Sequence, residues 1–462
     1  MSHSISEERL PTPTTPLEKI PIPELADVQP ANTTQIRQHK MKERIQLFTL
    51  CWVLFLAGWN DGSLGPLLPR IQEFYHIGYT IVSLIFVLQC VGCIFGAVIN
   101  ISLSQRYGLG KLLVFGSCLQ IVAYPLQAAA LPFPVFVIAA VINGAGLAIQ
   151  DAQANAYVAS LADNSETKMG FVQAAYGLGA LIAPLVSTQF AQLQHWSFHY
   201  LVSLGVTALN TIFLVAAFRG KTIDECLAQI GQDPTHDDSE EQNEKSHFQQ
   251  ILSHKAVHLL GVFLLVYVGV EVTNGGWIVS YMITVRGGGP STGYVSAGYF
   301  GGLTLGRVLL LPVNKWIGER PVIYLYGLIA IGLELVIWLV PSLVGDSIAA
   351  AFMGVVLGPI YPIAMNHAGR VFPRRLLTGS IGWIAGIATT GSAIIPFIVG
   401  AIASKAGIKN LVPVVVSMMA VMLVLWAIVP DTKIEGSNVD RAAETMESTD
   451  EKQAIPEFVR NE

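Results

Sequence analysis

The sequence predicts an all-α integral membrane protein with twelve transmembrane helices in two pseudo-symmetric six-helix bundles. Three observations support this fold class. Of the 462 residues, 52% are apolar and only 13% are charged, whereas a soluble domain carries about 25% charged residues. The apolar residues gather in runs of roughly 20, the length that crosses a bilayer. The first six and the last six runs also share residues at a near-constant spacing.

Polar segments divide the chain into five predicted parts. Residues 1–43 are rich in proline, threonine and glutamine, so we expect a disordered cytoplasmic tail. The first bundle is predicted over 44–218, a cytoplasmic linker with an acidic centre over 219–256, the second bundle over 257–430, and a second cytoplasmic tail over 431–462. The spans are predicted near 46–68, 80–101, 112–131, 134–160, 170–191, 197–218, 257–282, 294–313, 321–341, 346–367, 377–402 and 411–430.

Basic residues in the short loops predict the orientation. Loops that carry Arg106 and Lys111, Lys315 and Arg320, and Arg370 all fall on the side of the N-terminus. By the positive-inside rule, both termini are expected in the cytosol. We expect a monomer in the plasma membrane bilayer, and the net charge of −5 gives no indication of nucleic-acid binding.

The two halves repeat one another. When the first half is aligned with the second at a shift of 210 residues, the acid Asp61 falls on the acid Glu271, and several glycines fall on glycines. The other matches at this shift are Gly65 with Gly275, Gly92 with Gly302, Gly96 with Gly306, Gly108 with Gly318, Gly144 with Gly354 and Leu147 with Leu357, and a shift of 212 adds Gly179 with Gly391, Ile182 with Ile394 and Pro184 with Pro396. Two such halves around a midplane site are typical of secondary transporters.

The first apolar run carries an acid near its end. Asp61 falls within the hydrocarbon core, where a carboxylate is costly, so we expect it to face a polar cavity or a partner. Gly58, Gly62, Gly65 and Pro66 surround it and predict a break in the helix at this point. The structural alternative is a buried aspartate that caps a neighbouring helix.

Two glycine pairs and two basic turns occupy matching places in the halves. Gly92 with Gly96 and Gly302 with Gly306 are GxxxG pairs, which predict close helix contact. After each pair comes a short basic turn, 104–111 and then 314–320. These turns resemble the loop signature of the major facilitator superfamily, with Gln105 in place of its acid and Leu109 in place of a base. The resemblance implies gating or structural roles for Arg106, Gly108 and Gly318.

Within that superfamily, the first half is similar to the fucose–proton symporter group. That group has an Asn-Asp pair late in its first helix, matched by Asn60 and Asp61. An acid followed by small residues and asparagine in the fourth helix is matched by Asp151 to Asn155, and a fifth-helix glutamine by Gln173. The resemblance implies proton-coupled uptake of a sugar-like solute.

The seventh predicted span departs from that group at one position. Glu271 stands where the group has a glutamine, and Asn274 and Trp277 follow it. Asp61 is predicted in the outer half of the membrane and Asp151 in the inner half, so the two acids suit a proton relay. Burial can bring a carboxyl group to titrate near physiological pH. An acid that stays ionised would instead hold Na⁺ or a cationic substrate.

Amides and aromatic residues supply the predicted substrate contacts. Amides both donate and accept hydrogen bonds, which suits a hydroxyl-rich ligand, and flat rings suit a sugar face. The candidates are Asn60, Gln89, Gln150, Asn155, Gln173, Asn274, Trp277, Asn366 and Trp383. Helix packing is the alternative role for the aromatic residues. Arg307, near the inner end of the eighth span, is expected to be a gate or a structural partner.

Two other functions remain open from the residues. Gly170, Gly179 and Pro184 keep part of the fifth-helix pattern of proton antiporters, which favours an exporter of small organic molecules as the alternative. A nutrient sensor without transport would signal through its tails. An enzyme is not expected, because the sequence has no nucleophile–base pair and no HExxH-type metal motif. No cofactor and no metal are predicted.

Overall fold

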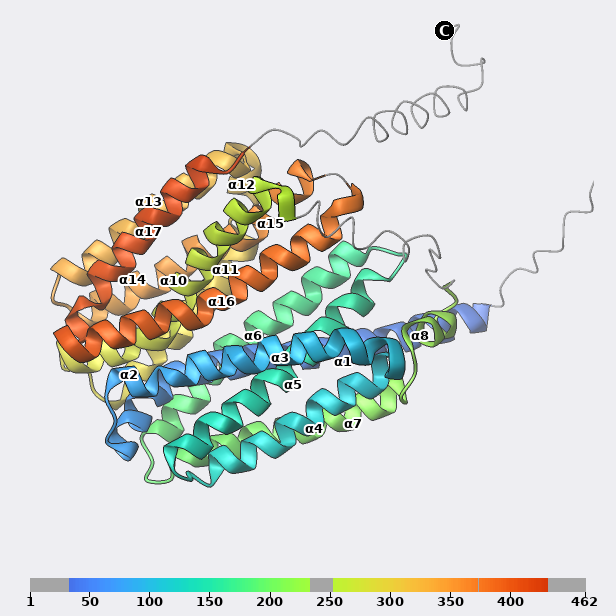
Figure 1. Cartoon of the computed structure of the whole chain (residues 1–462), viewed down its shortest axis with the longest axis horizontal. Coiled ribbons are helices and arrows are strands. Elements are labelled where there is room, and N and C mark those ends of the chain that lie inside the picture. Colours follow the sequence, from blue (N-terminus) through green and yellow to red (C-terminus); the bar gives the residue numbers. More distant parts are fainter. Residues whose placement is uncertain (1–32, 233–251, 373, 431–462) are drawn as a thin grey trace, which may run out of the picture.

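The computed structural model describes residues 33–232, 252–372 and 374–430, and every regular element in these ranges is a helix (Figure 1). The helices form two groups, with the first half of the chain in one and the second half in the other. Residues 1–32 of the predicted N-terminal tail, the whole predicted tail 431–462 and the acidic centre of the predicted linker lie outside the described residues.

The first half begins with a long helix and ends with a short one. Its helices are α1 (Thr33–Tyr75), α2 (Tyr79–Val82), α3 (Leu84–Tyr107), α4 (Leu109–Ala128), α5 (Phe133–Ala159), α6 (Ser165–Ala191), η1 (Trp196–Phe198), α7 (His199–Phe218) and α8 (Ile223–Gln229). The short helix α8 lies within the predicted linker and packs on the first half through its apolar side chains.

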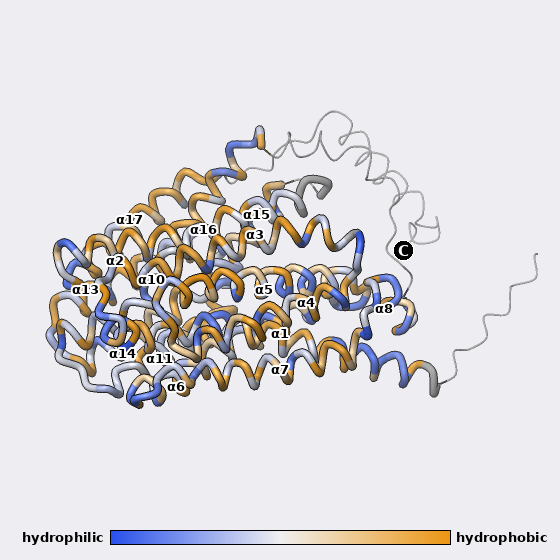
Figure 2. Tube along the Cα trace, turned by 60° about the horizontal axis from the view of Figure 1, so that its bottom comes forward, coloured by the Kyte–Doolittle hydropathy of each residue, from blue (hydrophilic) through white to orange (hydrophobic). Residues whose placement is uncertain are grey.

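The second half repeats this order of helices, but two of its spans are each divided into two helices. Its helices are α10 (Lys255–Arg286), η2 (Pro290–Gly293), α11 (Tyr294–Leu309), α12 (Leu311–Ile317), α13 (Glu319–Leu339), α14 (Leu343–Leu357), α15 (Ile360–Val371), α16 (Arg374–Ala406), η3 (Ile408–Asn410) and α17 (Leu411–Ile428). The divided spans are α11 with α12 and α14 with α15. Most helices are hydrophobic along much of their length, whereas hydrophilic residues are concentrated in α8 and at the start of α1 (Figure 2).

The described residues contain the twelve predicted spans. Eleven helical stretches are long and apolar enough to cross a membrane, and α11 with α12 forms a twelfth that is bent by 53°. The tenth span combines α14 and α15, which Gly358 and Pro359 separate. The fold class predicted from the sequence is confirmed.

Helix α1 differs from the prediction in two ways. It begins at Thr33, inside the segment predicted as a disordered tail, and it continues without a break to Tyr75. The glycines around Asp61 therefore do not interrupt the helix. They let other helices approach, because a Cβ atom at Gly58 would lie 1.9 Å from the carbonyl oxygen of Tyr176 and one at Gly62 would lie 2.4 Å from that of Ala180.

The predicted GxxxG contacts are confirmed, and they repeat between the halves. A Cβ at Gly92 would lie 2.1 Å from the carbonyl oxygen of Val141, on α5. At the equivalent Gly302, a Cβ would lie 2.2 Å from the carbonyl oxygen of Ala351, on α14. The contacted residues are themselves 210 positions apart. The duplication predicted from the sequence is thus present in the helix packing.

The basic turns also have equivalent geometry in the two halves. Gly108 separates α3 from α4 with φ of +74°, and Gly318 separates α12 from α13 with φ of +91°. Both angles lie in the region that favours glycine. Arg106 is exposed in the first of these turns.

The halves meet mainly at one end of the bundle. We call the end where α1 begins and α17 ends the tail end, and the opposite end, which carries α2 and η2, the far end. The Cβ position of Gly65 lies 2.3 Å from the carbonyl oxygen of Gly275. Nearer the far end, the Thr80 amide donates to Ser404 Oγ at 2.9 Å. Within the described residues, hydrogen bonds between the halves are recorded from the middle of the bundle to the far end.

Candidate functional site

Asp61 lies at the centre of a polar cluster in the first half. Its side chain is exposed although its neighbours on α1 are buried or half-buried, so it faces a space that solvent can reach. The Tyr176 hydroxyl on α6 donates to Asp61 Oδ2 at 2.8 Å, and Asn60 Nδ2 donates to Oδ1 at 3.2 Å. Asn143 Nδ2 on α5 donates to Asn60 Oδ1 at 2.7 Å. Three helices therefore orient one carboxylate.

Close packing of α1 against α6 brings these groups together. Gly58 and Gly179 face each other's helices: Gly58 contacts the backbone of Tyr176, and Gly179 contacts that of Phe55. Larger residues at either glycine would separate the helices, because the obstructing atoms belong to the backbone and cannot rotate away. The position of the Tyr176 hydroxyl beside Asp61 thus depends on small residues one turn away.

A second polar set lies nearer the tail end. Asn155 Nδ2 donates to Asp151 Oδ1 at 3.1 Å, and Gln173 Nε2 donates to Asn155 Oδ1 at 3.4 Å. All three side chains are half-buried. The charges of Asp151 and Asp61 are close enough to interact. The proton relay predicted from Asp61 and Asp151 stays a prediction.

The second half places an opposite charge pair toward this cluster. Glu271 on α10 and Arg307 on α11 are half-buried and within electrostatic range of each other. Tyr176 of the first half interacts electrostatically with both of them as well as with Asp61. The Tyr299 hydroxyl donates to the Glu271 carbonyl oxygen at 3.1 Å and fixes this part of α10. Opposite charges of the second half therefore lie within electrostatic range of Tyr176, which bonds Asp61.

Three predicted substrate residues do not reach this cluster. Gln150 is 1% exposed and donates to the Leu113 carbonyl oxygen at 2.9 Å, inside the α4–α5 contact. Asn274 is 1% exposed and faces Met353. Trp277 is fully buried, and its Nε1 donates to the Pro396 carbonyl oxygen at 3.2 Å. In this conformation these side chains hold helices together and do not line an accessible space.

The other predicted substrate residues have varied surroundings. Gln89 on α3 is half-buried beside Asp61. Trp383 on α16 is half-buried, with its ring 6.4 Å from that of His258. Asn366 is exposed on α15, near the tail end. Of these three, Gln89 is the one that joins the Asp61 cluster.

Sequence reasoning missed two members of the cluster, Tyr176 and Asn143. Tyr176 follows Gln173 by three positions and therefore shares its helix face. Asn143 precedes Asp151 by eight positions on α5 and again shares a face. Helical spacing from the residues already chosen was the available signal for both.

The described residues contain no group of three or more His, Cys, Asp or Glu side chains that could hold a metal ion. The chemistry within reach of this site is proton binding at carboxylates, ion pairing and hydrogen bonding to a polar solute.

These features define a class of protein: a helical membrane protein with two related halves and a polar, charged site between them. The chain belongs to the Major Facilitator Superfamily, whose family model matches residues 50–349. It is a multi-pass membrane transporter of small molecules.

Curated proteins with similar sequences cover most of the chain. "Bypass of stop codon protein 6" of Saccharomyces cerevisiae is 27% identical over 82% of this chain and 81% of its own length. "Glucose/mannose transporter GlcP" of Bacillus subtilis is 22% identical over 75% of this chain and 85% of its own. A "Glucose/galactose transporter" of Brucella abortus is 24% identical over 78% of this chain and 88% of its own.

Solved structures share the fold. A variant of the nucleoside transporter NupG superposes with a TM-score of 0.68 at 9% identity, covering 83% of this chain and 99% of that one. A D-xylose-proton symporter superposes with a TM-score of 0.66 at 14% identity, covering 84% and 98%. At these identities the likeness concerns the fold alone.

Proposed function

We propose that this protein carries out proton-coupled uptake of a sugar or sugar-like solute by alternating access. The observation that carries the proposal is the exposed Asp61 carboxylate in mid-span, held by Tyr176 and Asn60, with Glu271 and Arg307 of the other half within electrostatic range of Tyr176. The resemblance of Asn60–Asp61 and of 151–155 to the fucose–proton symporter group supports it, as do relatives named for glucose, mannose and galactose transport.

Each set of residues has a distinct part in this proposal. Asp61 binds and releases the coupled proton, since a carboxylate within a membrane protein is costly when ionised and gains from protonation. Asp151, nearer the tail end, passes the proton toward that side. Asn60, Asn155, Gln89 and the neighbouring amides exchange their mutual hydrogen bonds for bonds to solute hydroxyl groups.

The orientation follows from the basic loops. With both termini in the cytosol, the tail end faces inward and the far end faces outward. The contacts between the halves from mid-bundle to the far end then correspond to a conformation that is closed to the outside. The plasma membrane is the location that suits an uptake system of this kind.

Reconstituted vesicles test the coupling. Purified protein should accumulate labelled glucose or galactose when the outside is more acidic, and accumulation should disappear when the gradient is removed. Asp61→Asn keeps the size of the side chain but cannot change its charge, so it should abolish accumulation. Exchange of labelled for unlabelled solute needs no net proton movement and should persist in part. Asp163→Asn, at an exposed loop position, is the matched control.

Two results would contradict this assignment. If Asp61→Asn vesicles still follow the imposed gradient as the wild type does, Asp61 is not the coupling acid and Glu271 becomes the candidate. If accumulation instead follows a sodium gradient at constant pH, proton coupling is wrong. Glu271→Gln should cause a milder loss than Asp61→Asn or Asp151→Asn, because it restores the residue type of the symporter group.

A further inference from the structure

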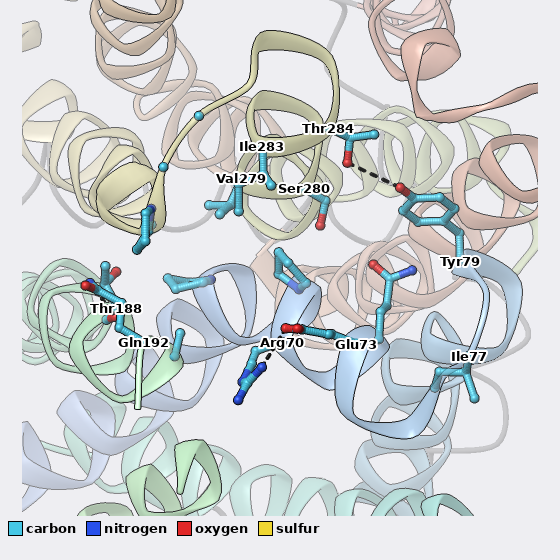
Figure 3. A pocket seen from close by; sticks show the side chains of 18 of the residues that line it. Arg70, Glu73, Ile77, Tyr79, Thr188, Gln192, Val279, Ser280, Ile283 and Thr284 are labelled. Atoms are coloured by element: carbon cyan, nitrogen blue, oxygen red, sulfur yellow. Dashed lines mark hydrogen bonds and ion pairs between the residues drawn. The ribbon is translucent and has the colours of Figure 1, made fainter. Parts of the chain in front are cut away.

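A cavity of about 740 Å³ opens at the far end, between the two halves (Figure 3). Its walls come from α1, α6 and the start of α2 in the first half, and from α10, η2 and the segment before η2 in the second. The contact between Gly65 and Gly275 separates it from Asp61, because the lining begins at Pro66 on α1 and at Val279 on α10. It is therefore distinct from the site around Asp61.

One wall carries a buried hydroxyl without a partner. Ser280 is 2% exposed, and its Oγ has no hydrogen-bond partner in the structure. Figure 3 shows this oxygen directed from α10 into the space above α1. A buried polar atom that makes no hydrogen bond destabilises the folded protein. A bound polar molecule would remove that destabilisation.

The remaining lining mixes polar and apolar side chains and carries no net charge. Arg70 and Glu73 pair with each other at 2.6 Å, so their charges offset. Thr284 and Tyr79 add hydroxyl groups, and Gln192 adds an amide, so donors and acceptors occur on opposite walls. Proline and isoleucine side chains supply apolar surface between them. Such a mixture suits a neutral molecule with several hydroxyl groups and a non-polar face.

We propose that this far-end cavity is a second binding site, for neutral polyhydroxylated small molecules, and that its occupancy holds the far end closed. A molecule here contacts α1 and α10 at once, so it binds best when the two halves are as near as they are in this structure. A ligand that binds one conformation better shifts the population toward it. The site therefore acts as an inhibitory site for solute arriving at the far end. This inference does not depend on proton coupling.

Equilibrium binding separates the two sites. Labelled D-glucose is titrated into the full-length protein in lipid nanodiscs, and the wild type should show two classes of site. Asn60→Ala should lose only the class around Asp61. The double variant Ser280→Val/Thr284→Val should lose only the far-end class, with affinity there at least tenfold weaker. Ser417→Val, at an exposed serine that bonds its own helix, is the matched control.

A second readout tests the effect on conformation. Glucose should slow hydrogen exchange in 72–80 and 284–293 of Asn60→Ala, because these segments form the closed far end, and should not do so in the double variant. Should the double variant fold poorly, Gln192→Leu at the exposed end of α6 replaces it.

Three outcomes overturn the inference. These are a single class of site that Asn60→Ala removes, unchanged glucose binding in the cavity variants, and no glucose binding in any protein. If far-end binding is retained while vesicles fail to accumulate sugar, the proposed transport function is contradicted and this inference is supported.

Discussion

Gln150 and Gln173 are both glutamines within apolar helices, but their neighbours give them different roles. Gln150 accepts from Gln120 Nε2 at 3.0 Å and donates to a backbone carbonyl, so its amide is used inside the α4–α5 contact. Gln173 is half-buried and makes one long bond to Asn155. An amide that is already satisfied and buried stabilises the fold, and one that is accessible can bind a solute.

This difference gives a prediction for the two residues. Gln150→Leu should lower the free energy of unfolding by about 1–3 kcal/mol, because Gln120 loses a buried partner. The KM for transported solute should stay within about twofold. Gln173→Leu should have the opposite pattern: KM for the transported solute should rise, because an accessible amide is lost, and the melting temperature should change little. Melting curves and vesicle uptake, measured on the same preparations, decide between them. A large change of KM in Gln150→Leu would contradict this prediction and would show that Gln150 contributes to solute binding.

At the scale of single residues, the sequence predicts which polar side chains lie within the membrane and roughly how deep they lie. It does not predict which of them form hydrogen bonds with one another. Asp61 was expected to face a polar space because a carboxylate is too costly in lipid, and the structure exposes it. Its hydrogen bond from Tyr176 depends on the register of α6 against α1, which backbone contacts at several glycines set together. No local pattern in the sequence contains that register.

Among the elements, glycine positions decide which helices can touch. Gly302→Val should prevent α11 from packing on α14, because the obstructing atom is the carbonyl oxygen of Ala351 at 2.2 Å. We expect little folded protein by size-exclusion chromatography. Gly332→Val on α13 is the control, since nothing lies within 4 Å of its Cβ position. Monodisperse Gly302→Val protein with wild-type stability would show that α11 can shift at small cost.

The short helix α8 shows what the sequence left undetected. Thr222 and Glu225 form a capping box at its start, and Leu227 and Cys226 are fully buried against the first half. Seven residues are too few for a clear helical period, so this segment was assigned to a polar linker. Its docking depends on Cys226 and Leu227, on Ile223 packed beside them, and on one backbone bond, from the Gly110 amide to the Lys221 carbonyl oxygen at 2.8 Å.

Cys226 provides a test of that docking. Burial raises the pKa of its thiol to about 11, so the thiol stays protonated from pH 7 to pH 9 while α8 is docked. Alkylation by a maleimide, followed by mass spectrometry, should be slow in the folded protein and fast after denaturation. Thr222→Ala removes the cap and should speed labelling several-fold. Equal labelling rates in the native and denatured proteins would mean that α8 is not docked in solution.

For the whole molecule, the number of spans and their duplication were predictable from periodicity, but the conformational state was not. Twelve apolar runs and repeated glycines are properties of the sequence, and the helices confirm them. A transporter must visit several arrangements of its halves, and the same sequence specifies all of them. The contacts that close the far end belong to one of these arrangements.

Gly65 gives a prediction at this scale. Gly65→Ala places a methyl group 2.3 Å from the carbonyl oxygen of Gly275, so α1 and α10 must separate. Hydrogen exchange in 72–80 and 284–293 should become faster, and the rate of solute exchange in vesicles should change. Gly78→Ala, whose Cβ position has its nearest atom at 3.5 Å, is the control. Unchanged exchange in Gly65→Ala would show that the far end is held closed by other contacts.

The meeting of Gly65 with Gly275 also bears on how the two halves use equivalent positions. A shift of 210 residues matches the two glycines, and they meet where α1 and α10 cross. The contact is one-sided, because a Cβ at Gly65 would lie 2.3 Å from the carbonyl oxygen of Gly275, whereas a Cβ at Gly275 would lie 2.6 Å from the ring of Phe300. A duplicated chain can therefore keep the same residue at two equivalent positions for two different packing reasons.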